Sequence, residues 1–190
     1  MLSDAGEPDD SLVARVRRGD TAAVAQLYER YHHHVRGFAR RLLGDAASAE
    51  DLVHDVFVAL PRAASTYRAQ APLAVFLLSI AVNHSRTHLR GSMRRRRALD
   101  RFELEPRPSP VGPDDAVERR ELAAALLRAL DTLPDEQRVA FVLCEVEERT
   151  SVEAASILEV PEGTVRTRLF HARRKLREHF AGEDEDHARV

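Results

Sequence analysis

The chain has 190 residues, enough for one large domain or two small ones, and it has few aromatic residues and no tryptophan. Its many Ala, Leu, Val, Arg and Glu residues favour helices over strands, and its single cysteine, Cys144, excludes an internal disulfide and lies in an apolar run typical of a buried, inert thiol. A formal net charge of −2 argues against a uniformly basic coat for nucleic acid.

The first ten residues are acidic and are predicted to form an N-terminal tail, 1–10. They lack the basic and apolar parts of a signal peptide. The longest apolar run, Pro72–Val82, is too short to span a bilayer. We therefore expect a cytoplasmic protein with no segment inserted in a membrane.

Apolar residues at helical spacing predict a compact helical domain over residues 11–97. Within it, Asp20 is expected to cap a helix that stops at Gly44. Ser48 and Asp51 have the spacing of a capping box, which predicts the start of the next helix.

A long basic helix and a linker follow. Pro72 is expected to open a helix that becomes strongly basic towards Arg97. Residues 98–113 contain four prolines and few apolar residues, which predicts a flexible linker. Helical spacing then predicts a second domain over residues 114–180, and the acidic tail 181–190 is expected to be frayed.

The second domain closes on a predicted helix-turn-helix. Thr150 and Glu153 match a capping box for its first helix, and a Pro-Glu-Gly turn precedes a second helix expected to begin at Thr164. The apolar residues of the second helix recur at steps of four, three and four: Val165, Leu169, Ala172 and Leu176. Its other face is basic, with no acidic residue up to Arg177. This pattern is typical of a helix for the DNA major groove, and the alternative is a solvated amphipathic helix.

The charges of the chain are unevenly distributed. Residues 84–101 and 164–177 form two basic islands, whereas acidic residues gather at 4–10, 50–55 and 114–121. Two separate positive surfaces suggest a protein that meets nucleic acid in two places and another partner between them.

Several motifs follow one another in a characteristic order. They are AEDLVHDVF at 49–57, IAVN at 80–83, Leu133-Pro134, Arg138 and PEGTVRTRL at 161–169. With them the sequence resembles the bacterial sigma factors of the extracytoplasmic-function (ECF) group over nearly its whole length. The resemblance implies an all-α fold of two small helical domains, sigma region 2 and sigma region 4 with its helix-turn-helix, joined by the flexible linker. It implies binding to core RNA polymerase and promoter-specific initiation at −10 and −35 elements.

The resemblance implies that an acidic helix of the first domain docks on core RNA polymerase. Asp51 and Asp55 lie four residues apart, hence on one helical face, where basic residues of a partner can pair with them. His54 and Phe57 complete the predicted docking set. The alternative for Asp51 is an acid that only favours the N-terminus of its own helix.

The resemblance also implies a surface that opens promoter DNA at the −10 element. The amide of Asn83 can donate to and accept from a base edge, and Tyr67 is placed in a loop where it can stack on a base. Arginines of the following helix would hold phosphates. The predicted set is Tyr67, Asn83, Arg86, Arg90, Arg94 and Arg95, and the alternative for the arginines is a solvated tract beside the linker.

The last helix is implied to face the −35 element. Arg166 can bind guanine at two points, and Phe170 can touch a thymine methyl. The predicted set is Arg166, Thr167, Arg168, Phe170, His171, Arg173 and Arg174, with Arg168 and Arg173 as phosphate anchors. His171 stands where relatives commonly have arginine, so the promoter sequence is not predicted.

The sequence is less consistent with other functions. The histidines 32–34 point in different directions on a helix and cannot share one ion, so no metal or other cofactor is expected. The sequence offers no nucleophile–base pattern or Gly-rich phosphate loop, which predicts that the protein is not an enzyme. The main rival is a dimeric helix-turn-helix regulator that binds duplex operators without core polymerase, and a further one is an adaptor that binds only protein. The resemblance adds an anti-sigma factor, wedged between the two domains, as an expected partner.

Overall fold

A computed structural model describes the backbone of residues 7–102 and 114–187 and the side chains of residues 7–95 and 122–181. These ranges form eight α-helices and no strand, which confirms the all-α prediction. The helices are α1 (Asp9–Arg17), α2 (Thr21–Leu43), α3 (Ala46–Ala63), α4 (Leu73–Phe102), α5 (Asp114–Leu130), α6 (Asp135–Phe141), α7 (Ser151–Leu158) and α8 (Glu162–His187). A 3-10 turn, η1 (Ala64–Thr66), follows α3, and a π-helical turn, η2 (Val142–Val146), continues α6.

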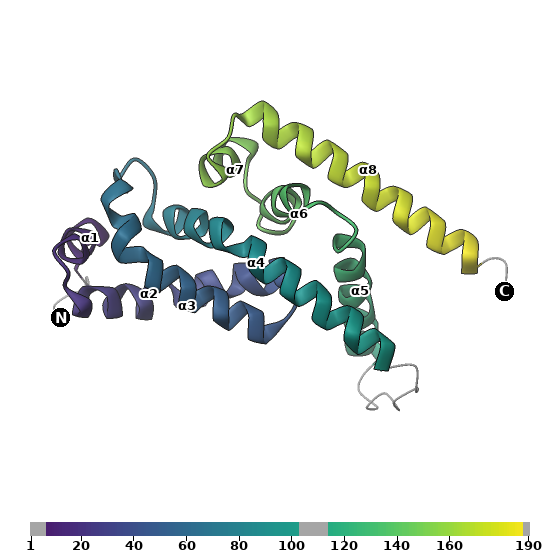
Figure 1. The fold of residues 1–190 in the computed structure, drawn as a ribbon. Coiled ribbons are helices and arrows are strands. Elements are labelled where there is room, and N and C mark those ends of the chain that lie inside the picture. The colour runs from purple at the N-terminus through teal and green to yellow at the C-terminus, as the bar shows by residue number, and fades with distance from the viewer. Residues whose placement is uncertain (1–6, 103–113, 188–190) are drawn as a thin grey trace.

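Helices α1 to α4 pack together as an N-terminal half, in which α2, α3 and α4 are mutually adjacent (Figure 1). Their apolar faces meet in a shared core that includes Leu27, Phe38, Leu52, Leu60 and Leu77, all fully buried. Because these residues recur at helical spacing, each helix turns one apolar stripe inwards. None of the helices in the described ranges is both long and apolar enough to cross a bilayer.

The helix starts are set by acidic caps. Asp20 caps α2 by accepting hydrogen bonds from the backbone of Ala22 and Ala23, as predicted. The expected capping box at Ser48 is wrong, because Asp45 caps α3 and accepts from the backbone of Ala47 and Ser48. Ser48 lies inside the first turn and is buried, where its hydroxyl donates to Asp45. The Asp45 carboxylate is the better cap than the Ser48 hydroxyl because it accepts from two of the unpaired backbone donors at the helix start.

Two helices run further than expected. Helix α4 continues to Phe102 and covers the first five residues of the expected linker 98–113, of which residues 103–113 lie outside the described ranges. Helix α8 continues to His187, through most of the tail expected to be frayed. Neither extension contains proline, and adding residues to an existing helix costs far less than starting one.

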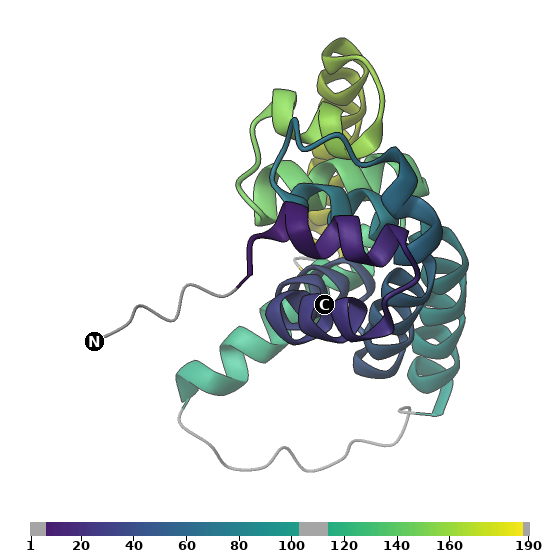
Figure 2. The ribbon, with the colours of Figure 1, turned by 90° about the vertical axis from the view of Figure 1, so that its left-hand side faces the viewer.

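The N-terminal half also contacts the C-terminal half, α5 to α8. Helix α4 packs against α7 and α6. The same arrangement is visible in Figure 2, where α7 and the start of α8 lie above α4. Gly44, the left-handed residue that ends α2 at φ 69°, lies so close to Leu127 that a Cβ there would come within 2.5 Å of its side chain. The sequence predicted two domains, and their packing against each other is an additional finding.

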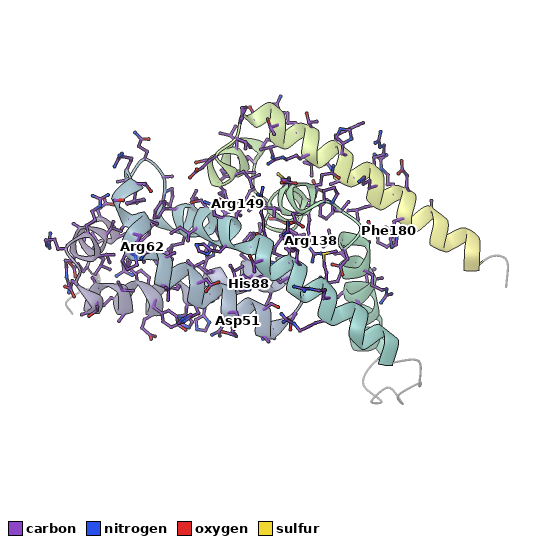
Figure 3. The ribbon with its side chains drawn as sticks, in the orientation of Figure 1. Asp51, Arg62, His88, Arg138, Arg149 and Phe180 are labelled. Atoms are coloured by element: carbon purple, nitrogen blue, oxygen red, sulfur yellow. The ribbon has the colours of Figure 1, made fainter. Side chains whose placement is uncertain are left out.

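Arg138 forms the most buried link between the halves (Figure 3). Its side chain is 1% exposed, and its Nε and Nη2 atoms donate to the carbonyl oxygen of Leu42 at 2.9 and 2.6 Å. Its Nη1 atom pairs with Asp131. The Leu42 carbonyl belongs to the last turn of α2, where carbonyls lack intrahelical donors, so α6 supplies a cap for α2.

Candidate nucleic-acid interface

Helices α7 and α8 form the predicted helix-turn-helix. The capping box at Thr150 and Glu153 is confirmed: the Thr150 hydroxyl accepts from the Glu153 backbone, and the Glu153 carboxylate accepts from the Thr150 backbone at 2.8 Å. These hydrogen bonds hold the pKa of Glu153 below its ordinary value. The chain then turns at Glu159, which ends α7 in the left-handed conformation at φ 53°.

The start of α8 differs from the expectation. The helix begins at Glu162 rather than at Thr164, so Gly163 lies in its first turn. The carbonyl of Pro161 accepts the backbone N–H of Thr164 at 2.9 Å, which shows that helical bonding is already established there. An acidic residue in the first turn is favourable, because backbone N–H groups give a helix start a partial positive charge.

The contribution of the Thr150 cap to stability can be tested by substitution. Replacing Thr150 by alanine is expected to lower the free energy of unfolding by about 1 kcal/mol, because the backbone N–H of Glu153 loses its acceptor. Urea unfolding followed by circular dichroism measures this change. Thr150→Ser keeps the hydroxyl and is the matched control. A loss in the serine variant as large as in the alanine variant would contradict the cap's role.

The apolar stripe of α8 is buried as predicted, and the basic face is turned to solvent. Val165, Leu169, Ala172 and Leu176 are at most 8% exposed. Of the predicted −35 set, Arg166, Thr167, Phe170, Arg173 and Arg174 are exposed, and Arg168 and His171 are half-buried. Phe170 is 58% exposed, so its ring is accessible to a partner.

Acidic neighbours hold several of these side chains. Arg166 pairs with Glu162 at 2.5 Å, and Arg173 pairs with Glu145 at 2.5 Å. The hydroxyl of Thr167 donates to the carbonyl of Gly163 at 2.9 Å. Pairs as exposed as these contribute little to stability, so phosphates can displace the acids at small cost.

Five members of the predicted −10 set are exposed along α4, namely Asn83, Arg86, Arg90, Arg94 and Arg95. Arg86 pairs with Glu136 of α6 at 2.8 Å, which links it to the other half of the chain. Arg95 is turned back onto α3: its Nε donates to the Asp45 carboxylate at 3.0 Å, and it also donates to Ser48. Arg95 therefore supports the start of α3 in this structure, although its side chain is 52% exposed.

Tyr67 does not offer the exposed ring that was expected for stacking. Its side chain is buried, its ring packs against Phe76 with centroids 5.2 Å apart, and its hydroxyl donates to the carbonyl of Ala71. Burial raises the pKa of the Tyr67 hydroxyl. The loop at 66–71 does line a hollow of about 290 Å³, together with Phe76, Ser156 of α7 and Glu159 at the end of α7, so Tyr67 shapes the wall of that hollow.

The acidic docking set divides in two. Asp51 and His54 are exposed on α3, and Asp55 is partly exposed with its Oδ2 atom 2.7 Å from Nε2 of His88. Phe57 departs from the expectation, because it is only 6% exposed and packs edge-on against Tyr28 in the core. Since α3 begins at Ala46, Asp51 lies in its second turn, beyond the reach of the partial charge at the helix N-terminus.

A second hollow joins the docking set to the −10 set. It encloses about 530 Å³ between α3 and α4 and is lined by Asp55, Val58, Arg62, Asn83 and His84, among others. Arg62, His84 and the exposed Val58 were not predicted. Helical spacing from Asp55 was the available signal for Val58 and Arg62, which follow it at steps of three and four on the same face. His88 had no such signal, because its partner lies on another helix.

The single thiol agrees with the sequence interpretation. Cys144 is half-buried in η2, and burial raises the pKa of its thiol. A thiol that stays protonated is a poor nucleophile. Nothing in the basic or acidic surfaces depends on it.

Two family models match the chain. The one described as Sigma-70 region 2 matches residues 27–96, and the one described as Sigma-70, region 4 matches residues 123–176. RNA polymerase sigma-H factor of Pseudomonas aeruginosa is 32% identical over 178 residues, which cover 90% of this chain and 92% of that protein. ECF RNA polymerase sigma-E factor of Escherichia coli K12 is 30% identical over 176 residues, which cover 88% of this chain and 92% of that protein.

Two solved structures share the fold. CnrH in complex with the cytosolic domain of CnrY has a TM-score of 0.60 at 24% identity, covering 92% of this chain and 97% of that one. The sigma factor RpoE in complex with the anti-sigma factor NepR from Bartonella quintana has a TM-score of 0.54 at 24% identity, covering 81% of this chain and 94% of that one.

Proposed function

Because the chain belongs to the ECF group of the sigma-70 family, we propose that it binds core RNA polymerase and directs promoter-specific initiation of transcription. One observation carries this proposal: the chain presents an acidic face on α3 and two separate basic helices, α4 and α8. A dimeric regulator of duplex operators needs only one basic surface and leaves the acidic face without a role. The chemistry of transcription belongs to the polymerase, so this chain acts as a cytoplasmic DNA-binding initiation factor and not as an enzyme.

The docking surface for core polymerase lies on α3. Asp51, His54 and Asp55 are the exposed polar residues of the predicted set. Asp51 has no structural use at the helix start, and within the described residues no cation pairs with it. Two carboxylates on one helical face fit a partner surface of basic side chains. Phe57 supports this surface indirectly, because its buried ring packs α3 onto α2.

The −10 surface combines the exposed side of α4 with the two hollows beside it. Reading a base outside the duplex requires a cavity for the base and cations for the backbone. Asn83 lines the hollow of about 530 Å³, and Arg86, Arg90 and Arg94 continue along the same helix. The loop at 66–71 and the buried Tyr67 form the wall of the other hollow.

The −35 surface is the basic face of α8. The helix begins directly after a tight turn, and a major-groove helix contacts base edges with its N-terminal residues. Arg166 and Phe170 are the exposed candidates for base contacts, and Arg168, Arg173 and Arg174 for phosphates. His171 lies beside Phe170, with ring centroids 5.5 Å apart, and is the residue with which we connect promoter preference.

An anti-sigma factor is the third proposed partner. Both solved structures of the same fold contain a bound partner protein, CnrY in one and the anti-sigma factor NepR in the other. In the present chain the contact between the halves includes Arg86, a residue of the −10 set, paired with Glu136. A protein that stabilises this contact would keep Arg86 from DNA.

Run-off transcription with core polymerase and genomic promoter fragments tests the proposed function. We expect initiation at defined start sites only when both the chain and core polymerase are present. Tight binding to duplex DNA without core polymerase, combined with no initiation, would support the dimeric regulator instead. Association with protein alone would support the adaptor.

Replacing Arg166 by alanine is expected to reduce transcription from a cognate promoter by about 5- to 150-fold, the loss of one two-point base contact. Core binding should stay unchanged, because α8 lies on the other half from α3. Run-off transcription and a core pull-down measure the two properties. Arg173→Ala is the matched control: as a phosphate anchor it should weaken all promoters alike and reduce the salt dependence of binding. A loss of core association in Arg166→Ala would contradict the role given to α8.

A further inference from the structure

His88 belongs to neither the predicted −10 set nor the predicted docking set, but it contacts a member of the docking set. Its Nε2 atom lies 2.7 Å from Oδ2 of Asp55, and its side chain is only 14% exposed. A carboxylate oxygen can only accept, so Nε2 carries the proton and donates. The contact joins α4, the helix of the −10 surface, to α3, the helix of the docking surface.

The imidazole of His88 is held by its place on α4. Ser85, Leu89 and Ser92 are buried on the side of α4 that packs into the N-terminal half, and His88 borders this stripe. An imidazole held in this way has little freedom to turn. Asp55 is different, because its side chain is 43% exposed and lies at the edge of the hollow between α3 and α4.

The hydrogen bond therefore orients the carboxylate of Asp55. With Oδ2 fixed by His88, Oδ1 is left to accept from a partner, since an ionised carboxylate has acceptor sites on both oxygens. Asp51, one turn earlier on the same face, has neither a hydrogen bond nor an ion pair within the described residues. A partner that binds Asp51 must immobilise it, whereas Asp55 is already immobilised.

We propose that His88 is a positioning residue for polymerase docking, which holds the Asp55 carboxylate in the orientation that a basic side chain of core polymerase binds. This proposal rests on the proposed function, because Asp55 must itself be a docking residue. The packing contact between α3 and α4 then contributes to the affinity for core polymerase, although His88 itself does not touch the polymerase. Removing the donor should weaken core binding about three- to tenfold, the usual cost of ordering one side chain at an interface.

A double-mutant cycle with the full chain and intact core polymerase tests the proposal. His88→Phe keeps a ring in the seam and removes the donor, whereas His88→Gln retains an amide donor at a similar reach. Core affinity is measured by fluorescence anisotropy of the labelled chain, for each variant alone and combined with Asp55→Asn. The same variants combined with Asp51→Asn form the matched control cycle. Thermal unfolding of each variant checks that α3 and α4 remain packed.

We expect His88→Phe to weaken core binding about three- to tenfold, His88→Gln to restore most of the affinity, and His88→Phe to have no further effect beside Asp55→Asn. In the Asp51→Asn background its effect should persist in full. An unchanged affinity in His88→Phe, or an equal loss in the Asp55→Asn background, overturns the positioning role alone. If Asp55→Asn binds core as tightly as the original chain, the docking role of Asp55 fails first, and this inference fails with it.

Discussion

Replacing Arg138 by alanine should lower the free energy of unfolding by about 3–5 kcal/mol, the usual cost of breaking a buried ionic contact from one side. The guanidinium is 1% exposed, and it serves two acceptors from different parts of the chain, the Leu42 carbonyl and the Asp131 carboxylate. Without it the Leu42 carbonyl at the end of α2 loses the two hydrogen bonds that Arg138 donates. The site also loses a large side chain, so a cavity adds to the cost.

Thermal unfolding followed by far-UV circular dichroism measures the effect, and for a chain of this size we expect a fall in Tm of roughly 6–20 °C. Arg86→Ala is the matched control, because the Arg86–Glu136 pair also joins the two halves but is 63% and 43% exposed. The control should cost less than about 1 kcal/mol. Equal losses in the two variants would show that burial of Arg138 does not determine its contribution.

The helices and their inward faces could be predicted because their signals are local. The stripe of Val165, Leu169, Ala172 and Leu176 follows from spacing alone, and its burial needs no knowledge of the rest of the chain. The cap at Thr150 is equally local, since donor and acceptor lie three residues apart. Such features include the whole basic face of α8, which explains why the helix-turn-helix was visible in the sequence.

Helix boundaries were less predictable, because several residues offer the same local chemistry. Asp45 and Ser48 are both good caps, and the choice between them depends on which one the fold buries. Ser48 is covered from α4 by Arg95, a contact across 47 positions of sequence. The end of α4 at Phe102 was missed for another reason: the prolines that suggested a linker begin at Pro106, and nothing before them breaks a helix.

Contacts between distant segments had no sequence signal. Tyr67 looked like an exposed loop residue, but Phe76 on the next helix provides an apolar surface that buries its ring. The His88–Asp55 contact and the Arg138–Leu42 contact each join two different helices. The periodicity of each helix does not specify how the two are rotated relative to each other. The candidate site was therefore predicted helix by helix, whereas the side chains that connect its helices were found only in the structure.

Replacing both Asp51 and Asp55 by lysine should weaken binding to core polymerase by at least about 100-fold. Each substitution removes an attraction and places a cation against a basic partner surface, and such like-charge contacts cost several kcal/mol at an interface. Asp51 is exposed in the second turn of α3, so its replacement leaves the helix start and its Asp45 cap intact. A core pull-down and anisotropy titrations at two salt concentrations measure the affinity. The loss should be larger at low salt, where charges are less screened.

The same change in net charge made elsewhere separates a specific surface from a general electrostatic effect. Glu29 and Glu148 are exposed and, within the described part of the chain, pair with no cation, so Glu29→Lys with Glu148→Lys is the matched control. This control should bind core polymerase within about threefold of the original chain, because rim charges act mainly on association rates. The proposed DNA contacts of α8 should survive in both variants, because none of the four substituted residues belongs to α8. If the two double variants lose equal affinity, net charge alone explains the result, and the acidic face of α3 is not the docking surface.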